Sequence, residues 1–149
     1  MEAANAGAHE VNQDGKIHSH GVCIGNINRP ETPNAFLSRQ YMHGNFFTRL
    51  HQFALLSSAF VVMKGGVGTM LELFTMWQLL QVGHLRDTPV ILVGAKWPGL
   101  LDWMRDAMIP DGCLDLREFN HVFLVSSVDD AIPIIMEAFG RFKLKNAAG

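Results

Sequence analysis

The residue types with the clearest chemical use lie in one stretch, Ala59–Glu72, which reads AFVVMKGGVGTMLE. Its first part, Ala59–Met63, is apolar and rich in β-branched residues, which predicts a buried parallel strand. The glycine-rich turn Lys64–Gly68 follows, and a helix is expected to open at Thr69. Glycines let backbone N–H groups approach an oxyanion closely, and a helix N-terminus adds partial positive charge. The stretch therefore predicts a phosphate site.

Two other glycine-loop motifs do not fit this turn. The dinucleotide fingerprint G-x-G-x-x-G needs its third glycine where Leu71 stands. The nucleotide-triphosphate loop needs Gly-Lys-Ser/Thr, but Gly68 is followed directly by Thr69, so the lysine that would reach the β- and γ-phosphates is absent. These departures disfavour a dinucleotide site and an ATPase.

Around this stretch, strand patterns and helix patterns alternate along the chain. Short apolar runs predict strands at Gly21–Gly25, Pro89–Val93 and Val122–Val125. Apolar spacing and start signals predict helices at Phe46–Ser57, Thr69–Gln81 and Pro98–Met108, a final helix capped by Ser126 or Ser127, and the end of a helix at Met1–Glu10. Two prolines make Asn26–Asn34 a loop. The alternation predicts an α/β domain with a mainly parallel sheet.

The composition limits the partners of the chain. Its 149 residues suit one domain, and only 17% of them are charged, against about 25% in ordinary soluble domains. The low charge, and a helix at Thr69–Gln81 that is apolar nearly all round, predict that a second copy covers apolar surface in a homodimer. The net charge of −2 argues against nucleic acid. No apolar run approaches the roughly 20 residues of a membrane span, so no membrane is expected.

The cysteines and histidines give no sign of a metal centre. Cys23 and Cys113 lie far apart without metal-type spacing, which predicts a reduced, cytoplasmic protein. His18 and His20 have no further ligand at a suitable spacing, so we expect no metal and assign both to the surface.

The sequence resembles the LOG ("Lonely Guy") family, often labelled lysine decarboxylase-like. The segment GGVGT with Glu72 three residues on resembles that family's PGGxGTxxE signature, and FFTRLHQFALLSSAFVVMKGGVGTMLELF resembles its arginine-bearing helix, strand, loop and next helix. TPVILVG, WPGLLDWMRDAMIPDGCLD and HVFLVSSVDDAIPII resemble its later elements. MEAANAGAHE resembles the segment after the family's first glycine-rich turn, so the likeness covers nearly the whole chain.

The resemblance implies a Rossmann-like three-layer fold, usually dimeric. It also implies an enzyme that hydrolyses the N-glycosidic bond of nucleoside 5′-monophosphates such as AMP or cytokinin riboside monophosphates, giving free base and ribose 5-phosphate. No pyridoxal phosphate chemistry goes with that fold, so no cofactor is expected and the decarboxylase label is discounted. The residues leave the preferred base open.

The resemblance also assigns roles to individual residues. Arg49 and Glu72 take the places of the catalytic arginine and glutamate. The phosphate-loop positions fall on Gly65, Gly66, Val67, Gly68 and Thr69. Two positions depart from the family: Lys64 stands where the family has proline, and Leu50 where a lysine commonly follows the arginine. Lys64 is either an additional phosphate contact or an inconsequential change, and we leave both readings open.

Topology gives an independent reason to pair Arg49 with Glu72. In a parallel α/β unit, the helix that precedes a strand and the helix that follows it both begin at the same edge of the sheet. This edge is formed by the carboxyl ends of the strands, and ligands bind there. Arg49 is expected in the first turn of the first helix, and Glu72 in the first turn of the second. A carboxylate can stabilise an oxocarbenium-like state and orient water, while a guanidinium can hold phosphate or stabilise the departing base.

Plainer structural readings exist for several of these residues. Glu72 could be an ordinary first-turn helix acid, and Arg49 a solvated surface charge. Three tryptophans and the methionines are expected in the core or in a dimer interface rather than in a ligand site: Trp77, Trp97 and Trp103.

The likeness also suggests a partial, N-terminally truncated domain over residues 1–149. Compared with the family, the chain lacks two strands that would lie between the Gly21 strand and the Ala59 strand. Two function hypotheses follow. One is a phosphoribohydrolase; the other is a non-catalytic nucleotide- or phosphate-binding module, or a self-associating remnant of the fold.

Overall fold

The structure, a computed structural model, describes residues 1–12, 14–25, 27 and 32–147. The chain divides into two compact units, Met1–Leu56 and Ser57–Gly149, and each is described by itself. The single domain predicted over residues 1–149 stays a prediction. Of the predicted loop Asn26–Asn34, residues 32–34 are irregular, as expected, while Pro30 lies outside the described residues.

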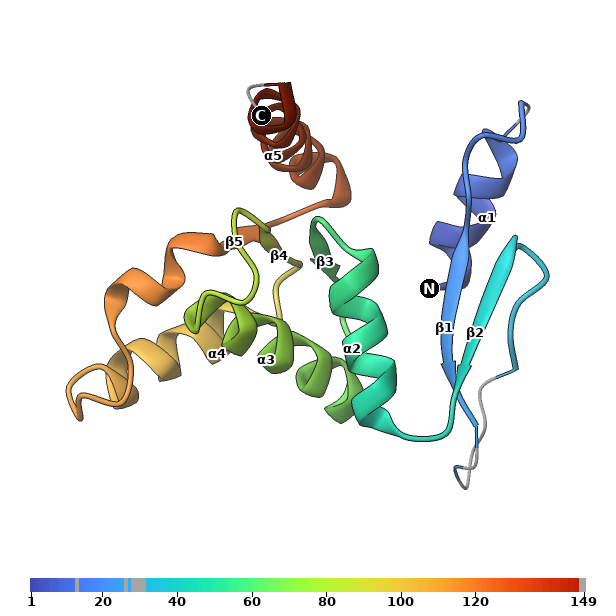
Figure 1. The fold of residues 1–149 in the computed structure, drawn as a ribbon. Coiled ribbons are helices and arrows are strands. Elements are labelled where there is room, and N and C mark those ends of the chain that lie inside the picture. Colours follow the sequence, from blue (N-terminus) through green and yellow to red (C-terminus); the bar gives the residue numbers. More distant parts are fainter. Residues whose placement is uncertain (13, 26, 28–31, 148–149) are drawn as a thin grey trace. The chain divides into compact units, whose positions relative to one another are not determined.

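The first unit contains two helices and two parallel strands (Figure 1). Its elements are α1 (Glu2–Glu10), β1 (His20–Ile24), β2 (Arg39–His43) and α2 (Phe46–Leu56). The strands pair from His20 opposite Arg39 to Ile24 opposite His43. The predicted α1, β1 and α2 are confirmed to within a residue or two, whereas β2 was not predicted.

The second unit contains a three-stranded parallel sheet in the order β3-β4-β5 (Figure 1). Its elements are β3 (Phe60–Val62), α3 (Val67–Gln81), β4 (Val90–Val93), α4 (Pro98–Trp103), a π-helical turn (Met104–Met108), a 3₁₀ helix (Leu116–His121), β5 (Val122–Val125) and α5 (Val128–Ala147). The α/β class with parallel sheets is therefore confirmed. In the residues that the structure describes, β1 pairs with β2 in the first unit, and β4 pairs with β3 and β5 in the second.

Helices cover both faces of β4, the middle strand. Because side chains alternate across a strand, Val90 and Leu92 join the cluster formed with α3 and α4, while Ile91 and Val93 pack against Ala131 of α5. Figure 1 shows α5 on one side of the sheet and α3 with α4 on the other. The second unit thus has the three layers expected of a Rossmann-like fold.

The strand predicted as buried at Ala59–Met63 is shorter and less buried than expected. Only Phe60–Val62 is extended, and Val61 is 40% exposed. The reason is its position: among the described strands of this sheet, β3 pairs with β4 alone, so one of its edges has no neighbouring strand. The fully buried strand is β4, whose four residues are all buried.

Two of the three tryptophans lie in the core. Trp77 and Trp97 are buried, and their indole N–H groups donate to the backbone oxygens of Glu118 (3.0 Å) and Val93 (3.1 Å). A buried indole needs such an acceptor. Trp103 is 59% exposed and so lies outside the core, and its place in a dimer interface stays a prediction.

Candidate functional site

The predicted phosphate loop connects β3 to α3 in the second unit. The helix begins at Val67, two residues earlier than predicted, and Gly66 is its N-cap. Gly66 has φ −105° and ψ −151° and provides no side-chain cap, since glycine has no side chain. Residues Met63 to Gly68 are all exposed. The first N–H groups of α3 have no acceptor within the helix, which is the arrangement that binds anions.

The three loop glycines have different surroundings. A Cβ added at Gly65 would lie 2.6 Å from the Cβ of Thr69, so Thr69 packs directly over this glycine. A Cβ added at Gly66 or Gly68 would meet no atom within 4 Å. Packing inside the protein therefore explains why a glycine is needed at position 65, whereas Gly66 and Gly68 border open space. Thr69 has a structural role over Gly65 besides the phosphate contact predicted for it.

Glu72 lies in the second turn of α3, not in the first as predicted, because the helix begins at Val67. It is half-buried. Residues four apart share a helix face, and side chains lean toward the helix N-terminus. The Glu72 side chain therefore lies on the same face as Gly68, next to the space that this glycine leaves open. A small polar group or a water molecule fits such a position.

Arg49 lies in the first unit, in the first turn and a half of α2. This helix begins at Phe46 after Asn45, whose side-chain oxygen accepts a hydrogen bond from the backbone N–H of Thr48 at 3.0 Å. The Arg49 Nε donates to the backbone oxygen of Val22 on β1 at 2.9 Å, and the guanidinium lies 5.0 Å from the Phe53 ring centre.

Arg49 is only 8% exposed, so its reading as a solvated surface charge is wrong. A buried guanidinium held by a strand carbonyl is fixed in direction, as a binding group must be. Arg49 belongs to one unit and Glu72 to the other, so their convergence on one ligand stays a prediction.

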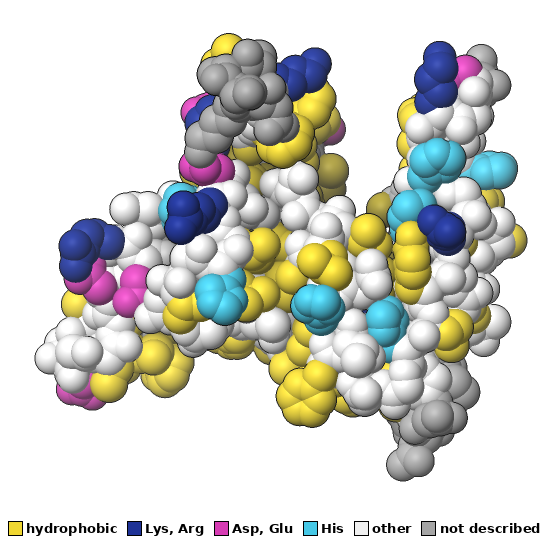
Figure 2. Space-filling model, in the orientation of Figure 1, with side chains coloured by type: hydrophobic (Ala, Val, Ile, Leu, Met, Phe, Trp, Pro, Cys, Tyr) yellow, Lys and Arg dark blue, Asp and Glu magenta, His cyan; other side chains and the backbone are white. Residues whose placement is uncertain are grey.

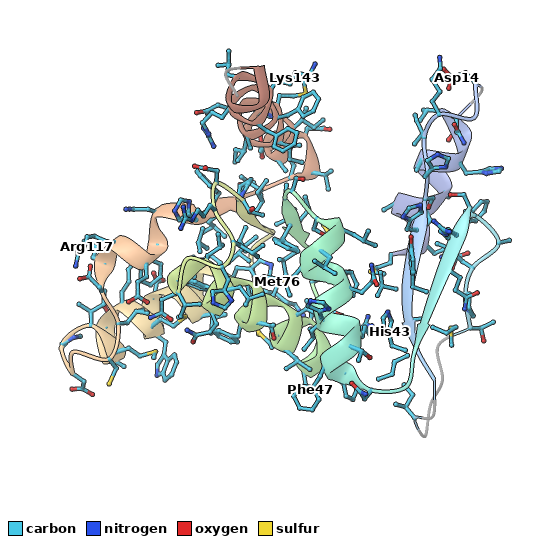
Figure 3. All side chains as sticks on the ribbon, in the orientation of Figure 1. Asp14, His43, Phe47, Met76, Arg117 and Lys143 are labelled. Carbon is cyan, nitrogen blue, oxygen red and sulfur yellow. The ribbon has the colours of Figure 1, made fainter. Side chains whose placement is uncertain are left out.

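His43 is a candidate that the sequence did not reveal. It ends β2, three residues before α2, and is labelled in Figure 3. Its Nε2 is buried and has no hydrogen-bond partner among the described residues. Buried polar atoms are normally paired, so an exception calls for a reason such as a bound ligand. His43 was overlooked because β2, with its half-exposed RQYMH sequence, has no clear apolar alternation.

A shallow cleft at the other end of α3 does not coincide with these residues. It is lined by Leu80, Gln81, Asp115, Arg117, Glu118 and His121. Hydrogen bonds from Arg117 to both Asp115 oxygens, at 3.0 and 2.7 Å, lower the pKa of that carboxyl to about 2. Asp115 and Glu118 also cap the 3₁₀ helix reciprocally. Both acids of this cleft are thus engaged in local structure.

The described residues form neither a metal cluster nor a membrane-spanning helix. In the part of the chain that the structure describes, no three His, Cys, Asp or Glu residues are arranged to hold a metal ion. No helix within the described ranges is long and apolar enough to cross a bilayer.

Comparison with known proteins points to one family. Residues 1–135 match the family model described as "Possible lysine decarboxylase". A relative from Mycobacterium tuberculosis (strain ATCC 25618 / H37Rv), named cytokinin riboside 5′-monophosphate phosphoribohydrolase, is 32% identical over 78 residues. The matched segment is 51% of this chain and 41% of the relative, so the chain covers about two fifths of that protein's length.

Proposed function

We propose that this chain, which belongs to the possible lysine decarboxylase (LOG) family, hydrolyses the N-glycosidic bond of nucleoside 5′-monophosphates. In this reaction the bond between the base nitrogen and C1′ of ribose breaks. Water supplies a hydroxyl to C1′ and a proton to the base, giving free base and ribose 5-phosphate. AMP and cytokinin riboside monophosphates are the substrates we favour, because the relative's name includes the latter class.

The observation that carries the proposal is the open N-terminus of α3. It combines an exposed loop, a capping glycine without a side chain, and open space beside Gly66 and Gly68. The substrate phosphate would accept hydrogen bonds from the backbone N–H groups of residues 66–69. Lys64, exposed in the same loop, would add a positive charge near the phosphate.

Glu72 is the acid we propose for the chemical step. Its place beside the space at Gly68 allows its carboxylate to orient a water molecule and to stabilise positive charge that develops on the ribose. Arg49 would bind either the phosphate or the departing base, with its direction fixed by the bond to the Val22 carbonyl. This assignment requires the two units to bring α2 and α3 to one ligand.

The family description and the relative's name suggest different chemistry. We favour the phosphoribohydrolase because the relative, 32% identical over 78 residues, is named for that reaction, and the open helix N-terminus suits the phosphate of its substrate. We also propose a cytoplasmic homodimer, as the composition predicts. The second candidate function is phosphate or nucleotide binding without turnover, for which the same loop would suffice.

The experiment is an assay of the purified chain with AMP and with a cytokinin riboside monophosphate, in which free base and ribose 5-phosphate are quantified. We expect turnover that Glu72→Gln lowers at least 100-fold with little change in nucleotide affinity. Glu2→Gln, an exposed acid in the first turn of α1, is the matched control and should leave turnover unchanged.

Three outcomes separate the alternatives. Nucleotide binding without release of base supports the non-catalytic module. If the chain released cadaverine from lysine in the presence of pyridoxal phosphate and did not act on nucleotides, the proposal would be contradicted. Turnover that survives Glu72→Gln would remove Glu72 from the chemical step.

A further inference from the structure

The first unit contains one buried polar atom that its own packing does not explain. The Nε2 atom of His43 is shielded from solvent and has no hydrogen-bond partner among the residues that the structure describes. Buried nitrogen and oxygen atoms are normally paired, because an unpaired one lowers the stability of the fold. A site at which a ligand supplies the missing partner is one place where such an atom is retained.

The backbone places His43 at the edge of the strand pair where ligands bind. His43 is the last residue of β2 and lies opposite Ile24, the last residue of β1. The Gly25 N–H donates to the His43 carbonyl oxygen at 2.9 Å, so the two strand ends lie side by side. Parallel strands bind ligands at their carboxyl ends, and α2 begins at this same edge, at Phe46.

The carbonyl group that holds Arg49 lies close to His43. This group belongs to Val22, two positions before Ile24 on β1. Residues two apart on a strand share a face, and so do paired residues of parallel strands, so Val22, Ile24 and His43 share one face. Strand spacings put the Cα atoms of Val22 and His43 roughly 8 Å apart. In Figure 3, His43 is labelled between α2 and the strand pair.

The proposed hydrolysis also needs a proton donor, which Glu72 and Arg49 do not supply. The departing base must gain a proton as its bond to C1′ breaks. The Glu72 carboxylate is ionised in its proposed role and acts on the water, while the Arg49 guanidinium does not release its protons. Histidine is the side chain that most often transfers protons near neutral pH.

We propose that His43 is the general acid that gives the departing base its proton, an inference that rests on the proposed function. As the bond from C1′ to the base nitrogen breaks, its electron pair goes to the base, which takes the proton from Nε2 of protonated His43. Water adds its hydroxyl to C1′ and gives its other proton to the Glu72 carboxylate. Glu72 then loses this proton to solvent, and neutral His43 takes one up.

The surroundings of Nε2 suit this role. A nitrogen without a partner in the protein gives up no internal hydrogen bond when it binds the base. Shielding from bulk water also limits loss of the proton before the base takes it. Because Arg49 is held beside the same strand face, the inference places the base, rather than the phosphate, near Arg49.

The variant His43→Gln tests the role directly. Glutamine keeps a hydrogen-bonding N–H group but has no proton that it can transfer. The kcat for AMP should fall about 100-fold, since a general acid typically contributes that much or more, while AMP affinity measured by calorimetry should not change. Histidines also lie on the surface (cyan in Figure 2), and the exposed His18 is the matched control. His18→Gln should leave kcat unchanged.

A second substrate separates proton transfer from a structural role. Nicotinamide mononucleotide has a positively charged base that leaves as a neutral molecule, so its hydrolysis needs no general acid. His43→Gln should therefore lower turnover of this nucleotide less than threefold. Both substrates are assayed on the same preparation, so any loss of folded protein lowers both rates equally. Equal losses for the two nucleotides would overturn the role of His43.

The outcomes distinguish this inference from the proposed function. If the wild type hydrolyses AMP and His43→Gln hydrolyses it equally fast, His43 is not the general acid and the proposed function stands. If the wild type releases base from neither nucleotide, the proposed function fails, and the role of His43 fails with it.

Discussion

Two strand-to-helix junctions of the same sheet, β3–α3 and β5–α5, differ in how the helix N-terminus is capped. At the start of α5, the Ser127 hydroxyl accepts a hydrogen bond from the Asp130 N–H at 3.2 Å, and the Asp130 carboxylate accepts from the Ser127 N–H at 3.0 Å. Asp129 and Asp130 both lie in the first turn. At the start of α3 there is no side-chain cap and no acid in the first turn.

The difference shows which junction can take an external anion. The α5 N-terminus already has its acceptors and carries negative charge, so a phosphate would be repelled. The α3 N-terminus has a glycine cap, open space beside Gly66 and Gly68, and Lys64 in the same loop. Parallel sheets bind ligands at this edge, so of these two junctions the one at α3 is suited to a phosphate.

Among the variants that test this comparison, Gly65→Ala should lower the unfolding free energy most. Its methyl group would meet the Thr69 Cβ at 2.6 Å, and overpacking of this kind costs about 1–3 kcal/mol of unfolding free energy. Urea denaturation measures the loss. In a double-mutant cycle, Gly65→Ala should cost clearly less in a Thr69→Gly background. Equal costs in both backgrounds would mean that Thr69 does not pack over Gly65.

A smaller effect is expected from Ser127→Ala at the capped junction. Loss of the serine cap should lower the unfolding free energy by about 1 kcal/mol. AMP affinity, measured by calorimetry, should not change. A parallel loss of AMP affinity would mean that the two junctions do not differ as described.

The smallest effect on stability is expected from Gly68→Ala. Alanine favours a helix over glycine by up to about 1 kcal/mol, and less near a helix end, so stability should rise slightly. Nucleotide affinity should nevertheless fall, since the new methyl group enters the space beside Glu72. Gly140→Ala in α5 is the matched control, because a Cβ there also meets no atom within 4 Å; it should leave affinity unchanged. Unchanged affinity in Gly68→Ala would place the ligand elsewhere.

Local patterns predicted most of the elements. The continuous apolar run Pro89–Val93 and the serine cap predicted at Ser126 or Ser127 depend on neighbours in sequence. Both predictions are confirmed, with Ser127 as the cap. The burial of β3 was predicted wrongly because it depends on which strands lie beside it. β2 was missed because its residues are half-exposed and do not alternate clearly.

The candidate site was predictable in its residue types but not in its details. The glycines and Glu72 could be chosen from sequence, yet the helix start at Val67 moved Glu72 to the second turn. The bond from Arg49 to the Val22 carbonyl joins residues 27 positions apart, which no local pattern specifies. The packing of Thr69 over Gly65 is likewise a contact in space that no sequence pattern specifies.

The central claim is that the open N-terminus of α3 binds phosphate, and a ¹H–¹⁵N NMR titration with AMP tests it most directly. The backbone amides of Val67, Gly68 and Thr69 should shift in a saturable way, while those of Val128, Asp129 and Asp130 should not. Gly66→Asp, which supplies the missing cap and a negative charge, should abolish the shifts. Shifts absent from the α3 amides, or unchanged in Gly66→Asp, would contradict the claim.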